Sequence, residues 1–270
     1  ALGVRHATLE ATGTWEAAGK EGFMEILTGG GLVGRLTSRS LIGGSYTRVV
    51  YRGHVVRDGL KVTMSDFVPA KPAVTYDIPT VMIIGTSMSA GKTTAARVIV
   101  RRLVAMGLQA GGAKVTGAGR YRDILSMKDA GASWVADFVD VGMPSTICPE
   151  DEFRARTATL MSIMAERGAD VSVVEVGASP LEPYNGAAAV EMFEDHVDLL
   201  VLCASDPYAV VGVIEAFGRR PDLITGITSN TDAGIALAER LSGVPCINIR
   251  DRRALAALDT LLVESLGIDA

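Results

Sequence analysis

The residues that most clearly indicate chemistry lie in a glycine- and serine-rich segment, 85–94. An apolar run at 81–85 precedes it, and a helix-forming stretch begins at Lys92. In a strand–loop–helix of this kind, backbone N–H groups can surround phosphate, a lysine adds positive charge, and a threonine hydroxyl can hold Mg²⁺. A chance Gly-Lys-Thr in an ordinary turn is the alternative, which the flanking strand and helix disfavour. We therefore predict a phosphate loop made by Gly85, Thr86, Ser87, Ser89, Ala90, Gly91, Lys92, Thr93 and Thr94.

Charged residues follow other expected strands of the same sheet. Ligands of parallel α/β sheets collect at the carboxyl ends of the strands. Glu175 ends one strand and is a candidate Mg²⁺ ligand beside Thr93, with a solvated strand-end acid as the alternative. Asp129 and Asp123 follow another strand, and either could be the second acid. Lys114 ends that strand and could neutralise charge on a transferred phosphoryl group, or it could be an ordinary surface lysine.

A loop rich in turn residues, 177–186, comes directly after the strand that carries Glu175. Its position makes it a candidate for contact with a substrate, although a plain surface loop is an equal alternative for any single member. The side chains that could make such contacts are Ser179, Glu182, Tyr184 and Asn185.

The elements that must position these residues alternate between apolar strands and helix-like stretches from residue 78 onward. This alternation is typical of a parallel sheet covered on both faces. We therefore predict an α/β fold class with a doubly wound, mostly parallel sheet of the P-loop NTPase type. The expected strands are 81–85, 110–115, 171–176, 199–203, 223–228 and 246–249, and the expected helices are 92–106, 152–167, 208–217, 233–241 and 252–266.

The first 77 residues follow a different pattern. Glycine clusters at 29–31 and 43–44 separate short β-like runs such as 46–50 and 60–64. An Arg-Asp-Gly sequence at 57–59 is typical of a hairpin turn. We predict a small β-rich domain over 1–77, built as an antiparallel sheet or barrel, and a P-loop nucleotide-binding domain over 78–270.

Composition excludes several classes of protein. The formal net charge of −5 argues against a non-specific nucleic-acid binder, which needs a surplus of basic residues. The three cysteines have no CxxC spacing, which argues against a disulfide framework or a zinc site. No apolar run is long enough to cross a bilayer, and no signal peptide is visible. We therefore expect a cytoplasmic protein that binds neither nucleic acid nor membrane.

The phosphate loop, with five residues between Gly85 and Gly91, resembles that of the dethiobiotin synthetase family of P-loop ATPases. Four further segments are similar to family motifs in the same order: 114–117, 128–130, 174–179 and 229–230. The resemblance implies ATP and Mg²⁺ as cofactors. It also implies Asp129 and Glu175 at the metal, Thr116 near phosphate and substrate, and Asn230 at the adenine.

A second resemblance concerns segments 136–140 and 175–180. They look like those of a two-domain P-loop family linked to D-glutamate metabolism, which carries an additional N-terminal domain. The resemblance is therefore to the superfamily, and it leaves the substrate open. The related proteins form homodimers, so a homodimer is expected by resemblance.

The favoured function is ATP- and Mg²⁺-dependent activation of a small carboxylate or carbamate by phosphoryl transfer, as a ligase, cyclo-ligase or kinase. Lys92 would hold the β- and γ-phosphates, and Lys114 would meet the developing charge. ATP is favoured over GTP because the guanine signature Asn-Lys-x-Asp is absent. One alternative is a regulatory or assembly ATPase whose N-terminal domain binds a protein partner. The other is an acyltransferase or deacylase that uses the loop as an anion site.

Overall fold

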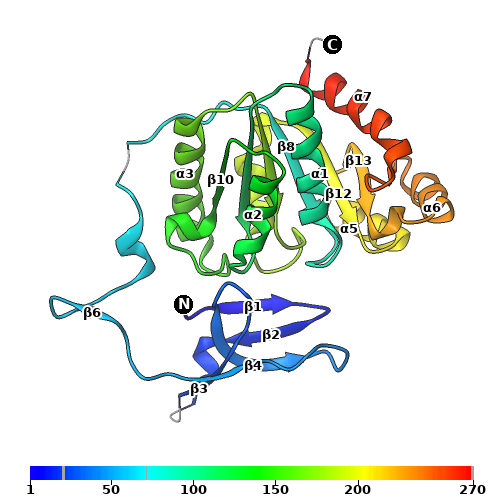
Figure 1. Ribbon diagram of the computed structural model, residues 1–270. Helices are drawn as coiled ribbons and strands as arrows, with labels where there is room; N and C mark the ends of the chain where they lie inside the picture. Colours follow the sequence, from blue (N-terminus) through cyan, green and yellow to red (C-terminus); the bar gives the residue numbers. More distant parts are fainter. Residues whose placement is uncertain (20–21, 71, 269–270) are drawn as a thin grey trace.

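The computed structural model describes residues 1–19, 22–70 and 72–268. A helix-covered parallel sheet forms the larger part, and a small antiparallel sheet lies against one end of it (Figure 1). Within the described residues, no helix combines the length and the apolar character needed to cross a bilayer.

The larger part is built on six parallel strands in the order β10-β9-β11-β8-β12-β13, which confirms the predicted fold class. Alternate residues of each strand point to opposite faces of the sheet. Met82 and Ile83, for example, belong to two separate apolar clusters, so both faces of the sheet are covered. The strands are β8 (Thr80–Gly85), β9 (Ala110–Thr116), β10 (Trp134–Asp137), β11 (Val171–Val176), β12 (Val197–Ala204) and β13 (Leu223–Gly226).

The helices form two layers. Buried side chains of α1 (Lys92–Ala105), α2 (Tyr121–Asp129) and α7 (Leu255–Leu266) pack on one face of the sheet. Those of α3 (Glu150–Arg167), α4 (Gly186–Met192), α5 (Pro207–Phe217) and α6 (Asp232–Ser242) pack on the other. The loops that follow β8, β9 and β11 therefore emerge together at one edge.

Two expectations about this sheet are wrong. The sixth strand is β10, which we did not predict, whereas 246–249 is not a strand. Only Cys246 pairs with β13, through a single bridge to Ile224, and the chain then turns at Asn248–Asp251. The turn that begins at Asn248 ends the pairing two residues after that bridge. Helix α4 was also not predicted, since it begins at Gly186 where we expected only the end of a loop.

The smaller sheet is antiparallel, as predicted, with the strand order β1-β2-β4-β3-β5. Its strands are β1 (Val4–Ala7), β2 (Ala11–Thr14), β3 (Phe23–Ile26), β4 (Val33–Arg39) and β5 (Arg48–Val50). A separate hairpin joins β6 (Val56–Arg57) to β7 (Leu60–Lys61) at the expected turn. Asp58 and Gly59 both have positive φ, +51° and +80°, as that tight turn requires. The strands expected at 46–50 and 60–64 are shorter, and the second cannot extend to residue 64 because Met64–Phe67 forms a 3₁₀ turn.

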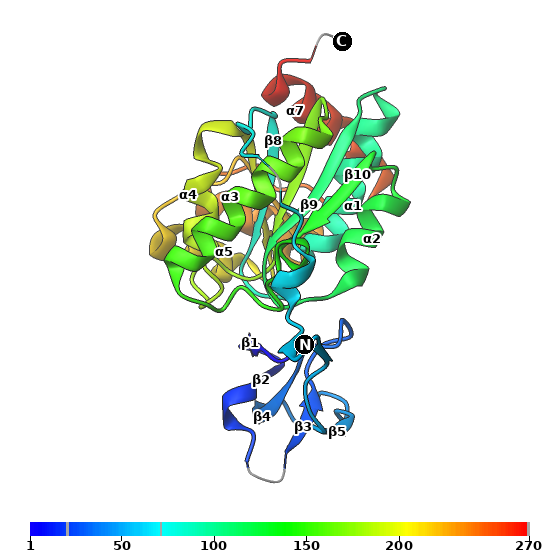
Figure 2. The ribbon, with the colours of Figure 1, turned by 90° about the vertical axis from the view of Figure 1, so that its left-hand side faces the viewer.

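The small sheet lies against the carboxyl edge of the large one (Figure 2). Leu27 and Leu32 of the small sheet share an apolar cluster with Ala118, Ala178 and Tyr184 of the larger part. The proposed boundary between 77 and 78 falls inside a packed segment, because Tyr76 is buried in the core of the larger part. We keep the two-domain division as a proposal.

Candidate functional site

The segment predicted as a phosphate loop connects β8 to α1. Gly91 has a φ of +108°, and a Cβ on Gly85 would lie 2.9 Å from the Lys92 ammonium. Both positions therefore need glycine if Lys92 is to lie back over the loop. The Lys92 Nζ donates a hydrogen bond to the Ser87 carbonyl at 2.6 Å. Burial lowers the pKa of this lysine, although Glu175 opposes the shift. The segment is thus compact, with the Lys92 ammonium folded back onto the loop.

The loop is tied to the neighbouring strand β12. The Thr86 N–H donates to the Cys203 carbonyl at 3.0 Å. The Thr86 hydroxyl accepts a hydrogen bond from the Ser205 N–H at 3.1 Å. The fully buried Cys203 therefore lies directly beneath the start of the loop.

Glu175 is a buried carboxylate beside the first turn of the helix that follows the loop. Its Oε1 accepts a long hydrogen bond of 3.5 Å from the Thr93 hydroxyl, and its Oε2 has no hydrogen-bond partner among the described residues. Burial raises the pKa of Glu175, and the negative charge of Asp123 adds to the shift, while Lys114 and Lys92 oppose it. A buried carboxylate with an unused oxygen beside a hydroxyl has the right chemistry to hold a divalent cation.

The described residues contain no group of three or more His, Cys, Asp and Glu side chains placed to hold a metal by themselves. Mg²⁺ commonly binds through one or two carboxylates together with substrate phosphates. Thr93 and Glu175 therefore fit Mg²⁺ only as partners of a bound nucleotide.

The two candidates for the second acid lie at opposite ends of α2. Asp123 is in the first turn, is buried, and forms an ion pair with Lys114 at the carboxyl end of β9. Asp129 is the last residue of the helix and is exposed. The nine residues of α2 rise about 1.5 Å each, so Asp129 lies away from the edge where Glu175 and Thr93 meet. The structure thus brings Asp123, not Asp129, to the site.

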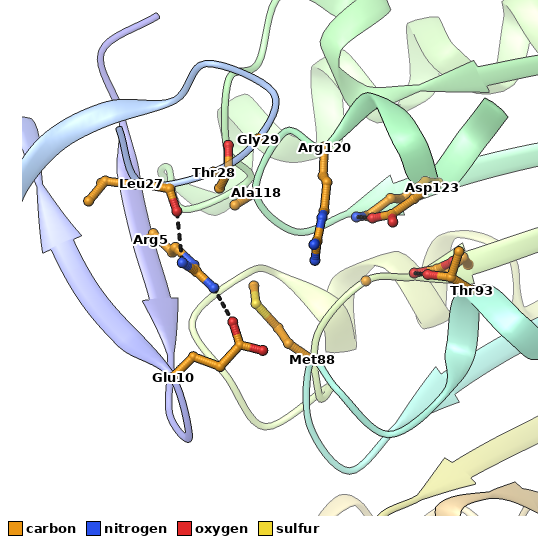
Figure 3. A pocket seen from close by; sticks show the side chains of 13 residues that line it. Arg5, Glu10, Leu27, Thr28, Gly29, Met88, Thr93, Ala118, Arg120 and Asp123 are labelled. Atoms are coloured by element: carbon orange, nitrogen blue, oxygen red, sulfur yellow. Dashed lines mark hydrogen bonds and ion pairs between the residues drawn. The ribbon is translucent and has the colours of Figure 1, made fainter. Parts of the chain in front are cut away.

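A cavity of about 220 Å³ lies between these residues and the small sheet (Figure 3). Thr93, Lys114 and Glu175 line one side, and Arg5 and Glu10 of the small sheet line the other. Glu10 forms an ion pair with Arg5 and accepts a hydrogen bond of 2.5 Å from Ser89 of the phosphate loop. Partial burial works to raise the pKa of Glu10, but Ser89 and Arg5 outweigh it and the pKa is lowered.

A second cavity of about 160 Å³ is lined by Gly91 and Thr94, at the end of the predicted phosphate loop. It brings Thr94 and Asn230 together with the chain after β13 and with the segment at Asn248–Arg250. Gly91 and Gly226 pack closely here, since a Cβ on Gly91 would lie 3.3 Å from the Gly226 Cα. The predicted adenine-contacting Asn230 is exposed at the mouth of this cavity.

The predicted substrate-binding side chains make contacts within the protein and do not line the 220 Å³ cavity. They hold the loop 177–186 in place and attach the small sheet to it. Within the larger part, the Thr116 hydroxyl accepts a hydrogen bond from the Gly177 N–H, the Ser179 hydroxyl accepts one from the Leu181 N–H, and Glu182 accepts one from the Ser179 N–H. The Asn185 amide donates to the carbonyls of Thr146 and Cys148. Two contacts reach the N-terminal part: the Tyr184 hydroxyl accepts from the His6 N–H at 2.6 Å, and Glu182 accepts from the Thr8 hydroxyl.

Sequence reasoning missed the contribution of the small sheet to the cavity. Nothing in the local pattern marks Arg5, Glu10 or Thr28, because each reaches the cavity only through the docking of that sheet. Arg120 also lines the cavity and is not among the predicted site residues. Its position after the carboxyl end of β9 is the signal that could have identified it.

No protein-family model and no curated protein matches the chain. Solved structures give distant likenesses. The hydrogenase maturation factor HypB from Archaeoglobus fulgidus is 15% identical, with 70% of this chain and 90% of that chain covered and a TM-score of 0.45. Chloroplast FtsY from Physcomitrella patens is 13% identical, with 75% and 70% covered and a TM-score of 0.44. The cell division protein FtsY from Thermotoga maritima is 16% identical, with 76% and 75% covered and a TM-score of 0.43.

Likenesses at this level assign neither a family nor an activity. The resemblance to dethiobiotin synthetases rests on the sequence motifs alone.

Proposed function

We propose that the chain is an ATP- and Mg²⁺-dependent enzyme that transfers a phosphoryl group to a small carboxylate or carbamate, as a ligase, cyclo-ligase or kinase. The observation that carries the proposal is the phosphate loop with Lys92 and Thr93 beside the unused, buried oxygen of Glu175. These groups supply the positive charge, the hydroxyl and the carboxylate that nucleotide and metal require.

In this proposal the loop N–H groups and Lys92 hold the β- and γ-phosphates. Thr93 and Glu175 hold Mg²⁺, which when bound neutralises charge on the phosphate oxygens. The acceptor oxygen forms a bond to the γ-phosphorus while the bond from that phosphorus to the β–γ bridging oxygen breaks, and the electron pair leaves with ADP. An amine can then attack the activated acyl carbon and release phosphate.

The size of the cavity beside Glu175 supports a small acceptor. At about 220 Å³ it is below the roughly 300 Å³ of the smallest pockets that take drug-sized ligands. The small sheet covers this side of the loop through the contact between Glu10 and Ser89. Such a cover would keep water from the γ-phosphate until the acceptor is bound.

The second cavity supports a place for the base. Thr94 and Asn230 line it on the far side of the phosphate loop from Glu175. We propose that the base lies there, so that the nucleotide extends across Gly91 and its γ-phosphate faces the larger cavity.

Titration calorimetry with ATP and with GTP, each with and without Mg²⁺, tests the proposal. We expect Mg²⁺-dependent binding that Lys92→Ala weakens by about tenfold to a hundredfold, the value of a charge-assisted hydrogen bond. Arg97→Ala is the matched control, because Arg97 is exposed on the same helix. Absence of nucleotide binding in the wild type would refute the proposal and would leave the loop as the anion site of an acyltransferase or deacylase.

A second candidate is a regulatory ATPase whose small sheet binds a protein partner. The hydrogen bond between Glu10 and Ser89 favours it, because a nucleotide bound at the loop would change the contact that holds the small sheet. Turnover that rises with an added small carboxylate supports the enzyme, whereas turnover that ignores every such compound and rises with a protein supports the regulator.

The homodimer stays a proposal that light scattering can check directly. A cytoplasmic location is likewise proposed: all three cysteines are free thiols, and Cys203 and Cys246 are buried, as suits a reducing compartment.

A further inference from the structure

The cavity beside the phosphate loop contains three cationic side chains, and two of them already have carboxylate partners. Arg5 is paired with Glu10, and Lys114 is paired with Asp123. Arg120 forms no ion pair with any residue that the structure describes. Its charge helps to lower the pKa of Glu10, but among the described residues that line the cavity it is the cationic side chain without an ion-pair partner.

Arg120 is placed to use that charge at the reacting end of a nucleotide. It precedes the first turn of α2 and so projects from the loop after β9. Figure 3 shows its side chain extending into the space between Arg5 on one side and Asp123 and Thr93 on the other. Thr93 and Glu175 line the same cavity, so the guanidinium and the proposed metal ligands face a common volume.

We propose that Arg120, and not Lys114, supplies the positive charge that meets the transferred phosphoryl group, and that the small sheet positions it. The inference rests on the proposed function. A guanidinium is always protonated, and its planar array of N–H groups matches phosphoryl oxygens. Lys114 shares its charge with Asp123, so the pair brings little net charge to the site. During transfer Arg120 donates hydrogen bonds to the equatorial oxygens and neither gains nor loses a proton.

The turn between β3 and β4 holds the backbone from which Arg120 projects. The Thr28 hydroxyl donates to the Gly119 carbonyl at 2.7 Å. Gly30 lies so close that a Cβ there would overlap the Gly119 carbonyl and lie 3.2 Å from the Arg120 Cα. Only glycine allows this approach. On the other side, the Gly119 N–H donates to the Pro144 carbonyl at 3.0 Å.

This contact gives a physical reason for part of the glycine cluster at 29–31. Thr28 and Gly30 are positioning residues, since they touch the backbone beside Arg120 rather than any reacting group. The small sheet thereby helps to position the site, because a displacement of the turn between β3 and β4 would displace the Arg120 guanidinium.

The direct test uses ADP, Mg²⁺ and aluminium fluoride, which imitates the phosphoryl group in transfer. We expect aluminium fluoride to tighten ADP binding in the wild type and to have no such effect in Arg120→Ala. Single-turnover hydrolysis of ATP should slow by about a hundredfold to a thousandfold, while affinity for ATP changes by less than about threefold. Arg120→Lys should recover part of the rate. Arg122→Ala is the matched control, since Arg122 is an exposed arginine two positions away.

The positioning role has its own test. Gly30→Ala should slow hydrolysis in the wild type but should have no further effect when Arg120→Ala is already present. Gly44→Ala is the control, because a Cβ at Gly44 would meet nothing within 4 Å. If Gly30→Ala does not fold, Thr28→Val, which removes one hydrogen bond, replaces it with the same expected pattern.

The outcomes separate the two proposals. Absence of nucleotide binding by the wild type overturns the proposed function and, with it, the inference. Normal nucleotide binding with equal hydrolysis and an equal aluminium fluoride response in Arg120→Ala overturns the inference alone. A wild type that binds ADP without any response to aluminium fluoride overturns the inference too. Equal slowing by Gly30→Ala with and without Arg120 overturns only the positioning role.

Discussion

The two sheets of this protein are stabilised in different ways. The parallel sheet has a large apolar cluster on each face, with fully buried side chains such as Ile83 and Met82. The antiparallel sheet has only a small cluster, and that cluster includes Ala118, Ala178 and Tyr184 of its neighbour. The small sheet therefore depends on docking for much of its packing, and the candidate site lies at that joint.

The largest effect is expected where the shared cluster is broken. Leu27→Asp would place an unpaired charge at a side chain that is 1% exposed, at a cost of more than about 3 kcal/mol. We expect the small sheet to detach while the parallel sheet stays folded, seen as faster hydrogen exchange confined to the first 50 residues. Leu41→Asp, at a position 97% exposed, should change stability by less than about 0.5 kcal/mol. Loss of protection throughout both sheets would show that they are one cooperative unit.

A second prediction concerns Asp137, at the carboxyl end of β10. Burial, reinforced by the negative charge of Asp140, raises its pKa from 3.8 to about 6. An acid with a raised pKa is protonated more readily in the folded state than in the unfolded state. The free energy of unfolding therefore falls as the pH rises from about 4 through 6. The wild type should lose up to about 3 kcal/mol relative to Asp137→Asn over this range in urea denaturation.

The control for Asp137 is Asp195→Asn, at an exposed position of the same part of the molecule. It should follow the wild-type pH dependence. A pH dependence that persists unchanged in Asp137→Asn would refute the assignment.

A smaller effect is expected from Tyr184→Phe. This change removes the hydroxyl that accepts the 2.6 Å hydrogen bond from the His6 N–H. The cost is about 1–3 kcal/mol, because the N–H loses its partner at the docking surface. Hydrogen exchange at His6 and thermal denaturation measure it, with the exposed Tyr208→Phe as control. Exchange at His6 equal to that of the wild type would contradict the role of Tyr184 in docking.

The smallest effect has the opposite pH dependence to that of Asp137. Glu10 has a pKa below its ordinary 4.5 because Ser89 and Arg5 outweigh its partial burial. A lowered pKa stabilises the docked state above about pH 4.5, and that stabilisation is lost as the pH falls further. Acid should therefore loosen the small sheet while it favours the parallel sheet through Asp137. Proteolysis of the first 50 residues should accelerate below that pH in the wild type and not in Glu10→Gln.

The parallel sheet could be predicted because its signals are local. Apolar runs ending in Gly85 or Glu175 indicated buried strands, and the order of Gly, Lys and Thr indicated the loop. β10 was missed because Trp134–Asp137 has only four residues, whereas 246–249 looked like a strand but pairs at only one residue. Composition alone cannot show how many neighbours a strand has.

The site could be predicted only in part, for a related reason. Lys114 and Asp123 lie at one sheet edge, which strand order makes predictable. Arg5 and Glu10 reach the same cavity from about a hundred residues upstream through side-chain contacts that no local spacing records. Similarly, Asp129 and Asp123 differ by less than two helical turns in sequence, yet only one faces the cavity.

The position of Cys203 beneath the phosphate loop has a practical consequence. Burial raises the pKa of this thiol to about 12, so the reactive thiolate is scarce and shielded while the loop is closed. We expect an alkylating reagent to reach this buried thiol only when the segment that begins at Thr86 moves away from β12, to which the Thr86 N–H is hydrogen bonded. In a variant with Cys148 and Cys246 replaced by serine, the rate of alkylation would therefore measure how often the loop opens. A ligand that holds the loop closed would slow that reaction without any need to observe the ligand itself.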